Sequence, residues 1–313
     1  MFKKTTFFLC FGLTMGLGFL RGNTQTQKSP ESHKILTIGA VSNNPQKHYK
    51  GLKLMVDYGV HHLKGEGYQA GAVFLAKDHQ ELMKALQERR VDWITLDPLY
   101  AHVYSRKTGA QIILRRWKKG IPQFTNYIFV KAGSEIRSLD QLKGKKIAFE
   151  KPDSAEGYLL PLAILRKKGF DLVYLSSPTD IPPSQKIGYV FSGGPLNTSA
   201  YVYKGLADAG VLTDFDWEQN ESIPAEVKDN FTILEQWQPF DLAVEMVRKD
   251  MPAAVKDRIK KMLVQPDGDR WTQYVFDQYD QTSAFEMADA LVETHINEIK
   301  KLMAYLKPVE ILK

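Results

Sequence analysis

The chain has 313 residues, a length typical of about two domains. Hydrophobic residues make up 43% and charged residues 25% of it, which is ordinary for a globular protein and excludes wholesale disorder. The formal net charge is +6, but three basic residues lie in the first 21 positions, where there is no acidic residue. The remainder carries 39 basic against 36 acidic residues, so its charge does not favour nucleic acid as a partner. We expect the one dense basic run, "RRWKK" (115–119), to be solvated surface.

The N-terminus has the layout of a secretory signal peptide. A short basic start is followed by sixteen uncharged, mostly apolar residues (5–20) and then by a polar stretch from Arg21. We assign residues 1–27 to a signal peptide and linker, and expect export, with an uncleaved membrane anchor or a lipid on Cys10 as alternatives. Cys10 is the only cysteine, so cleavage leaves a mature chain with no disulfide and no cysteine-bound metal.

The first third of the chain alternates between strand and helix patterns. Apolar runs rich in Ile, Leu and Val alternate with segments whose apolar residues recur every three or four positions. This alternation indicates a mostly parallel sheet with helices on both faces. The expected strands are residues 34–41, 68–76, 91–98 and 111–117, and the expected helices begin near 45, 77 and 99.

A second alternating unit follows a long strand at 123–134. "KIAF" (146–149) predicts a strand, "GYLLPLAILRKKGF" (157–170) a helix, and residues 232–247 two short strands. From residue 251 onward we expect only helices. The prediction is an α/β fold with two lobes, each a mostly parallel sheet flanked by helices, joined by two hinge crossings. The predicted domains are 34–124 plus 237–313 for lobe 1 and 125–236 for lobe 2.

The strongest local signal is "KPDSAEGYLLP" (151–161), at a strand-to-helix junction. One interpretation is a helix cap made by Asp153 or Ser154, with Gly157 relieving tight packing. The other is an anion-binding loop, because a helix N-terminus presents free N–H groups and partial positive charge. The two roles are compatible, and both stay open at this point.

Other candidate positions are weaker. "LDPLY" (96–100) is either a strand-ending turn or a place where Asp97 or Tyr100 touches a ligand. "FSGGPLN" (191–197) is rich in glycine but lacks the nucleotide-binding patterns. Large aromatic side chains are usually core, and Tyr127 in a crossing strand is the best of them for ligand contact. The other aromatic candidates are Trp93, Trp117 and Trp237.

Catalytic and metal-binding signatures are missing from the sequence. The adjacent His61 and His62 point in different directions on a helix, and no zinc-protease spacing occurs. Asp214 and Asp216 are two residues apart, as on one face of a strand, but they fall in a stretch that we expect to be an exposed turn. We therefore predict a protein that is not an enzyme, with no catalytic residue, no metal and no cofactor.

Three ordered stretches resemble one family, the phosphate/phosphite/phosphonate-type substrate-binding proteins of ABC transporters. They are "IGAVSNNPQKHYKGLKLMVDY", "SLDQLKGKKIAFEKPDSAEGYLLPLAILRKKGFD" and "GGPLNTSAYVYKGLADAGVLTDFDW". The resemblance covers roughly residues 35–265 and implies the two-lobe fold of type II periplasmic binding proteins. It implies a ligand oxyanion on the loop, with further contacts from the first lobe, the crossing strand and the second-lobe helix. The residues so implied are Asp153, Ser154, Ala155, Glu156, Gly157, Tyr100, Tyr127 and Asn197.

The sequence departs from the family pattern in two places. Ala155 and Glu156 stand where the family loop usually carries hydroxyl residues, and residues 195–197 replace a frequent His-Asp pair. A carboxylate beside a bound dianion is costly in a partly desolvated cleft, so Glu156 either binds a cationic group or points to water.

The resulting prediction is a monomeric periplasmic protein that captures a small anionic solute in the interlobe cleft for an ABC transporter permease. The alternative is a ligand sensor that signals to a membrane kinase or cyclase.

Overall fold

The computed structural model describes residues 34–42 and 44–311. The predicted signal peptide and linker lie outside these residues. Within the described part, no helix has both the length and the apolar character needed to cross a membrane.

The first sheet has six strands in the order β14-β4-β13-β3-β1-β2. β1 pairs in parallel with β2 and β3, whereas β13 lies antiparallel between β3 and β4, and β14 pairs antiparallel with β4. Four strands therefore share one direction, and only β13 and β14 oppose it. The strands are β1 (Lys34–Val41), β2 (Tyr68–Ala76), β3 (Trp93–Leu96), β4 (Gln111–Lys118), β13 (Ala243–Val247) and β14 (Thr282–Met287).

The second sheet also has six strands, in the order β11-β6-β10-β7-β9-β8. β10, β7, β9 and β8 are parallel, and β6 lies antiparallel between β10 and β11. Only β6 therefore runs against the other five. The strands are β6 (Asn126–Lys131), β7 (Lys146–Phe149), β8 (Leu172–Tyr174), β9 (Ile187–Phe191), β10 (Ala209–Thr213) and β11 (Phe231–Gln236).

A short two-stranded ribbon lies where the chain passes between the sheets. β5 (Gln123–Phe124) pairs antiparallel with β12 (Phe240–Asp241). The two crossings expected from the sequence are thus hydrogen-bonded to each other. The predicted domain boundaries remain a prediction, since they depend on how this ribbon is divided.

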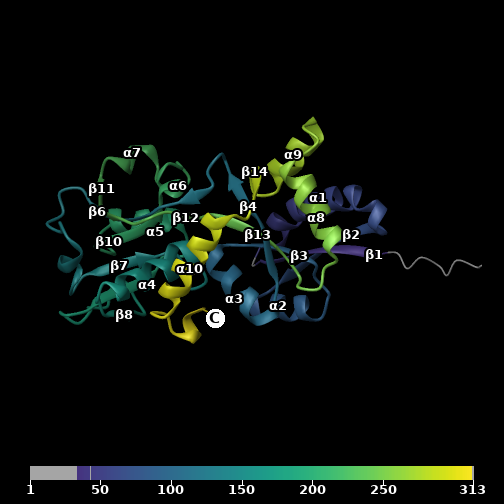
Figure 1. Ribbon diagram of the computed structural model, residues 1–313. Helices are drawn as coiled ribbons and strands as arrows, with labels where there is room; N and C mark the ends of the chain where they lie inside the picture. Colours follow the sequence, from purple (N-terminus) through teal and green to yellow (C-terminus); the bar gives the residue numbers. More distant parts are fainter. Residues whose placement is uncertain (1–33, 43, 312–313) are drawn as a thin grey trace, which may run out of the picture. The chain divides into compact units, whose positions relative to one another are not determined.

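Helices cover both faces of the first sheet (Figure 1). α1 (Pro45–His62), α8 (Ala253–Val264) and α9 (Arg270–Gln278) pack on one face, where Leu36 and Ile38 of β1 join their apolar cluster. α2 (His79–Gln87) and α3 (Pro98–Thr108) pack on the other. Alternate residues of β1 thus face opposite layers, as the strand's period of two requires.

The second sheet lies between α4 (Leu160–Lys167) and α5 (Pro195–Tyr203). The long helix α10 (Ala290–Met303) packs against α3 and α4 (Figure 1). The Arg166 guanidinium in α4 forms a two-pronged hydrogen bond with the Glu310 carboxylate. The remaining helices are η1 (Lys64–Glu66), η2 (Leu139–Leu142), η3 (Ala155–Leu159), α6 (Asp214–Trp217), α7 (Ala225–Lys228) and α11 (Pro308–Ile311).

Two sequence predictions that concern the first sheet are wrong. The segment after residue 251 is not all helical, because Thr282–Met287 forms β14 on the edge beside β4. Its Ala, Glu and Met favour a helix locally, but pairing with β4 decides its structure. The basic run at 115–119 is not all solvated surface. Arg115 and Arg116 are only 8% and 6% exposed, because they lie in β4 and point into ion-pair networks.

Candidate functional site

The predicted loop starts a helix, and Ser154 is its N-cap. The Ser154 hydroxyl accepts a hydrogen bond from the Gly157 N–H (2.9 Å) and donates one to Glu150 Oε2 (2.7 Å). A Cβ atom on Gly157 would lie 2.6 Å from the Glu150 Cβ, so this position requires glycine. The capping interpretation is therefore observed. The predicted ligand contacts of the loop remain a prediction beside it.

The helix begins with an unusual turn. Residues Ala155–Leu159 form a π-helical turn that continues into α4. Such turns are rare and frequently occur at functional sites. The turn is held in part by Asn126, whose amide donates a 2.7 Å hydrogen bond to the Glu156 backbone carbonyl. The crossing strand β6 thus fixes the position of the loop.

The end of β3 meets this loop. Asp97 caps α3 by accepting a 2.9 Å hydrogen bond from the Tyr100 N–H. Tyr100 is 2% exposed and stacks on His79, with 3.6 Å between ring centroids. Burial raises the Tyr100 pKa, and nearby negative charge from Asp97 and then Asp153 raises it further. Tyr100, in α3 beside the first sheet, is therefore near enough to Asp153, in the loop after β7 of the second sheet, to feel its charge.

Carboxyl groups gather around the loop. Burial, together with the charges of Asp97 and then Glu150, raises the pKa of Glu156 to about 8. Burial also raises the pKa of Asp97 to about 6, and the pKa values of Glu150 and Asp216 above their ordinary range. These side chains are half-buried by surface area, yet enough protein surrounds them for burial to dominate. At pH 7, Glu156 is therefore mostly protonated and neutral.

Sequence reasoning missed part of this cluster. Glu150 directly follows β7, and Asp216 lies in α6, which replaces the exposed turn expected there. No sequence pattern indicated that His79 belongs here, but its ring covers Tyr100 and burial lowers its pKa to about 4. Among the described residues, no group of three or more His, Cys, Asp or Glu side chains could hold a metal ion. No spacing in the sequence connects these positions, because only the fold brings them together.

The other predicted ligand residues have different neighbours. Tyr127 packs edge-on against Trp217, with ring centroids 5.9 Å apart. Asn197 is exposed, and its amide donates a 3.0 Å hydrogen bond to the Ser192 carbonyl, which closes the glycine turn before α5. These contacts give both residues a structural role. Their contact with a ligand remains a prediction.

A buried donor lies beside the loop on the second crossing. The Trp237 N–H donates to the Asn126 carbonyl (3.2 Å), so the two residues are cross-strand neighbours with side chains on one face. The Asn126 side chain reaches the loop at Glu156. Trp237 is 9% exposed, and its indole Nε1 has no hydrogen-bond partner among the described residues. An unpaired, buried indole N–H therefore lies on the face of the sheet from which Asn126 reaches Glu156.

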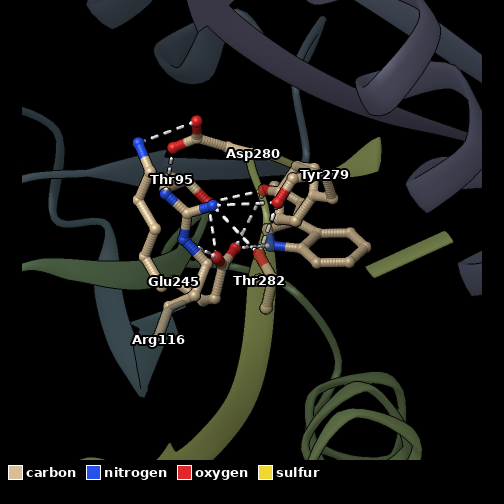
Figure 2. A network of polar contacts seen from close by, with 8 residues as sticks. Thr95, Arg116, Glu245, Tyr279, Asp280 and Thr282 are labelled. Atoms are coloured by element: carbon tan, nitrogen blue, oxygen red, sulfur yellow. Dashed lines mark hydrogen bonds and ion pairs between the residues drawn. The ribbon is translucent and has the colours of Figure 1, made fainter. Parts of the chain in front are cut away.

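A second polar cluster lies in the first sheet (Figure 2). Glu245 of β13 is fully buried and accepts hydrogen bonds from Trp93 Nε1 (2.6 Å) and the Thr95 and Tyr279 hydroxyls. Arg116 Nε lies 3.7 Å from Glu245 Oε1. Beside this cluster is a cavity of about 660 Å³, lined by the end of β1, the first turns of α1, Thr95, Arg116, Lys118 and residues 277–281. The one sequence signal for this polar cluster was a glutamate within the apolar strand "AVEMV".

Comparison with known proteins places the chain in a family. The family model described as "ABC transporter, phosphonate, periplasmic substrate-binding protein" matches residues 42–291. A solved structure of XAC2383 from Xanthomonas citri bound to chloride is 30% identical with a TM-score of 0.81, and the match covers 87% of this chain and 99% of that one. A second structure of that protein, bound to ATP, has a TM-score of 0.80 and the same identity and coverage.

More distant relatives agree. PhnD1 from Prochlorococcus marinus, in complex with methylphosphonate, shares the fold at 17% identity, with a TM-score of 0.63 and coverage of 87% and 97% of the two chains. The curated phosphate-import protein PhnD from Mycolicibacterium smegmatis is 25% identical over 61% of this chain and 58% of its own length. The putative aliphatic sulfonates-binding protein from Escherichia coli is 27% identical over 47% of this chain and 48% of its own length. The chain thus spans about half the length of the curated relatives it matches.

The predicted family and the predicted α/β fold class are confirmed by these matches. The chain belongs to the phosphonate-binding family of periplasmic substrate-binding proteins of ABC transporters.

Proposed function

We propose that the protein captures a small anionic solute, phosphate- or phosphonate-like, where the loop at 153–157 faces Asp97 and Tyr100, and delivers it to an ABC transporter permease. The family supports the transport role, and the two ligands named for the Xanthomonas citri structures, chloride and ATP, are both anions. The observation that carries the proposal is the helix start at 153–157, where Ser154 forms the N-cap and Asn126 holds the turn at Glu156, whose pKa is raised to about 8.

The chemistry of the loop suits an oxyanion when Glu156 is protonated. The first N–H groups of a helix have no partner within the helix, and they attract negative charge. A protonated Glu156 adds an O–H donor instead of a repelling charge, and the unpaired Trp237 Nε1–H adds a second donor on the same side. Glu156 is then part of the anion site, which removes the objection that its sequence position raised.

A solute that also carries a cationic group is the second candidate. Four carboxyl groups (Asp97, Glu150, Glu156 and Asp216) gather around the loop, and a bound ammonium group would favour their ionised forms. This arrangement would suit an aminophosphonate. The two candidates predict opposite responses to pH. Binding that needs protonated Glu156 weakens as pH rises through about 8, whereas binding of an ammonium group strengthens.

The test is isothermal titration calorimetry with phosphate, phosphite, methylphosphonate, aminoethylphosphonate, sulfate and taurine at pH 6 and pH 9. Some of these solutes titrate themselves, so Glu156→Gln serves as the matched control. We expect an oxyanion to lose affinity from pH 6 to pH 9 in the wild type and to lose less in Glu156→Gln. Failure of every solute to bind at either pH would exclude the proposed ligand class. A closed-state signal passed to a membrane kinase or cyclase remains the alternative, and genetic linkage to a permease or to a kinase would separate the two.

A further inference from the structure

The cavity beside the first sheet has features of a binding site that the loop does not explain. It lies where β1, β3 and β4 end, which is the edge of an open α/β sheet where ligands usually bind. Its volume of about 660 Å³ falls within the range of small-molecule sites. Two cationic side chains of β4, Arg116 and Lys118, line it. The cavity therefore has suitable size, location and charged groups.

Arg116 has unused hydrogen-bonding capacity at this site. Its Nη1 donates to the Tyr279 carbonyl (3.2 Å) and the Thr282 hydroxyl (3.1 Å), and its Nη2 donates to Asp280 Oδ2 (3.3 Å). Its Nε has no hydrogen-bond partner among the described residues, since Glu245 Oε1 is 3.7 Å away. Figure 2 shows the guanidinium between the carboxyl groups of Asp280 and Glu245. A buried guanidinium with a free N–H favours an additional acceptor.

Asp280 occupies the position that an anion would take. Its carboxylate bridges Arg116 Nη2 (3.3 Å) and Lys118 Nζ (3.0 Å). Its side chain is nevertheless 56% exposed, whereas that of Arg116 is 7% exposed. The carboxylate can therefore rotate towards water while the guanidinium stays fixed.

The turn that carries Asp280 does not depend on this carboxylate. Asp280 and Gln281 both have left-handed backbone conformations (φ +54° each). Backbone hydrogen bonds hold the turn, from Gln281 N–H to the Asp277 carbonyl (2.8 Å) and from Lys119 N–H to the Gln281 carbonyl (3.0 Å). Rotation of the Asp280 side chain leaves all of these bonds in place. It also leaves Arg116 and Lys118 facing the cavity, with Asp277 in the lining and Glu245 beside Arg116 as the remaining carboxylates.

We propose that this cavity is a second anion site, in which an oxyanion group of a solute replaces the Asp280 carboxylate between Arg116 and Lys118. In the unliganded protein Asp280 keeps the two cations paired, so no net positive charge is left unsatisfied. The volume beyond the two cations accommodates the rest of the solute. The chemical class is thus an organic phosphate, phosphonate or carboxylate larger than the bare oxyanion.

The test uses inorganic phosphate as the probe and the Trp93 indole as the reporter. Trp93 Nε1–H donates to Glu245, which lies beside Arg116, so its NMR signal senses this cluster. The signal is assigned by its loss in Trp93→Phe. In the wild type, we expect phosphate to shift the Trp93 signal in a saturable way.

Three variants decide the outcome. Asp280→Asn removes the competing carboxylate and should tighten phosphate binding about tenfold, and Lys118→Gln should weaken it about tenfold. Asp277→Asn is the matched control, because Asp277 lines the same cavity without pairing with Arg116 or Lys118, and it should change affinity less than about twofold. Arg116 is left intact, because its loss would strand the buried Glu245.

The result also separates this site from the loop. Ser154→Ala should leave the response of Trp93 to phosphate unchanged, whatever it does to solute binding at the loop. A Trp93 signal that does not move in either the wild type or Asp280→Asn would overturn the second site. So would a shift that Asp280→Asn and Lys118→Gln leave unaltered. Neither result would affect the proposed function of the loop.

Discussion

Two glutamates surrounded by protein, the half-buried Glu156 and the fully buried Glu245, differ in their neighbours. Burial raises the pKa of both. Around Glu245 this effect is opposed first by the charge of Arg116 and then by hydrogen bonds from Thr95 and Trp93. Around Glu156 it is reinforced, since the next neighbours are Asp97 and Glu150. A glutamate is thus part of an ion-paired network at position 245 and a mostly protonated acid at position 156.

The difference indicates which site tolerates change. A paired buried charge is costly to break, because removing one partner leaves the other desolvated. An unpaired buried acid is costly to ionise, and removing its charge costs little. We therefore expect variants around Glu245 to act mainly on stability. Variants around Glu156 should act on pH dependence and ligand affinity.

The largest effect should come from Arg116→Met. It leaves Glu245 buried without its cation, and we expect the free energy of unfolding to fall by about 3–5 kcal/mol. Urea unfolding measures this loss. Arg90→Met is the matched control, because Arg90 makes an exposed ion pair with Glu88 and should cost at most about 1 kcal/mol. An equal loss in both variants would mean that Glu245 does not need Arg116.

A smaller effect of opposite sign should come from Glu156→Gln. The folded pKa of Glu156 is about 8 against an ordinary 4.5, so the unfolded chain loses this proton at lower pH than the folded protein. The free energy of unfolding therefore falls as pH rises from 4.5 to 8 and then levels off. The variant lacks this dependence, and at pH 8 we expect it to be more stable by roughly 2 kcal/mol, after allowance for solvent screening.

Urea unfolding across this pH range checks the prediction. Glu293→Gln, at an exposed position of α10, provides the control. Parallel pH profiles for the wild type and Glu156→Gln would show that Glu156 is ionised throughout, and the contrast with Glu245 would then disappear.

Sequence reasoning found one of these regions and missed the other for a physical reason. The strand, cap and helix around Ser154 follow one another between Lys146 and Lys167, so their pattern is local. Glu245 and Arg116 are far apart in sequence and meet only because β13 lies beside β4. A run of basic residues usually indicates solvated surface, and that inference failed at Arg115 and Arg116 because each has acidic partners elsewhere in the chain. Pairing across a sheet is not visible in a local pattern.

The smallest effect should come from Ser154→Ala, which changes the part of the loop that the sequence predicted. The variant loses the cap to Gly157 and the hydrogen bond to Glu150, so we expect the free energy of unfolding to fall by about 1 kcal/mol. Asp289→Ala removes the N-cap of α10 and should cost a similar amount.

Ligand affinity then distinguishes these two caps. If the loop at 153–157 holds the solute, Ser154→Ala weakens binding in calorimetry and Asp289→Ala does not, although their stabilities match. Equal affinity in both variants would assign Ser154 to the helix cap alone. The acid cluster around Glu156, with the Trp237 indole, would then be the part of the site left to hold the ligand.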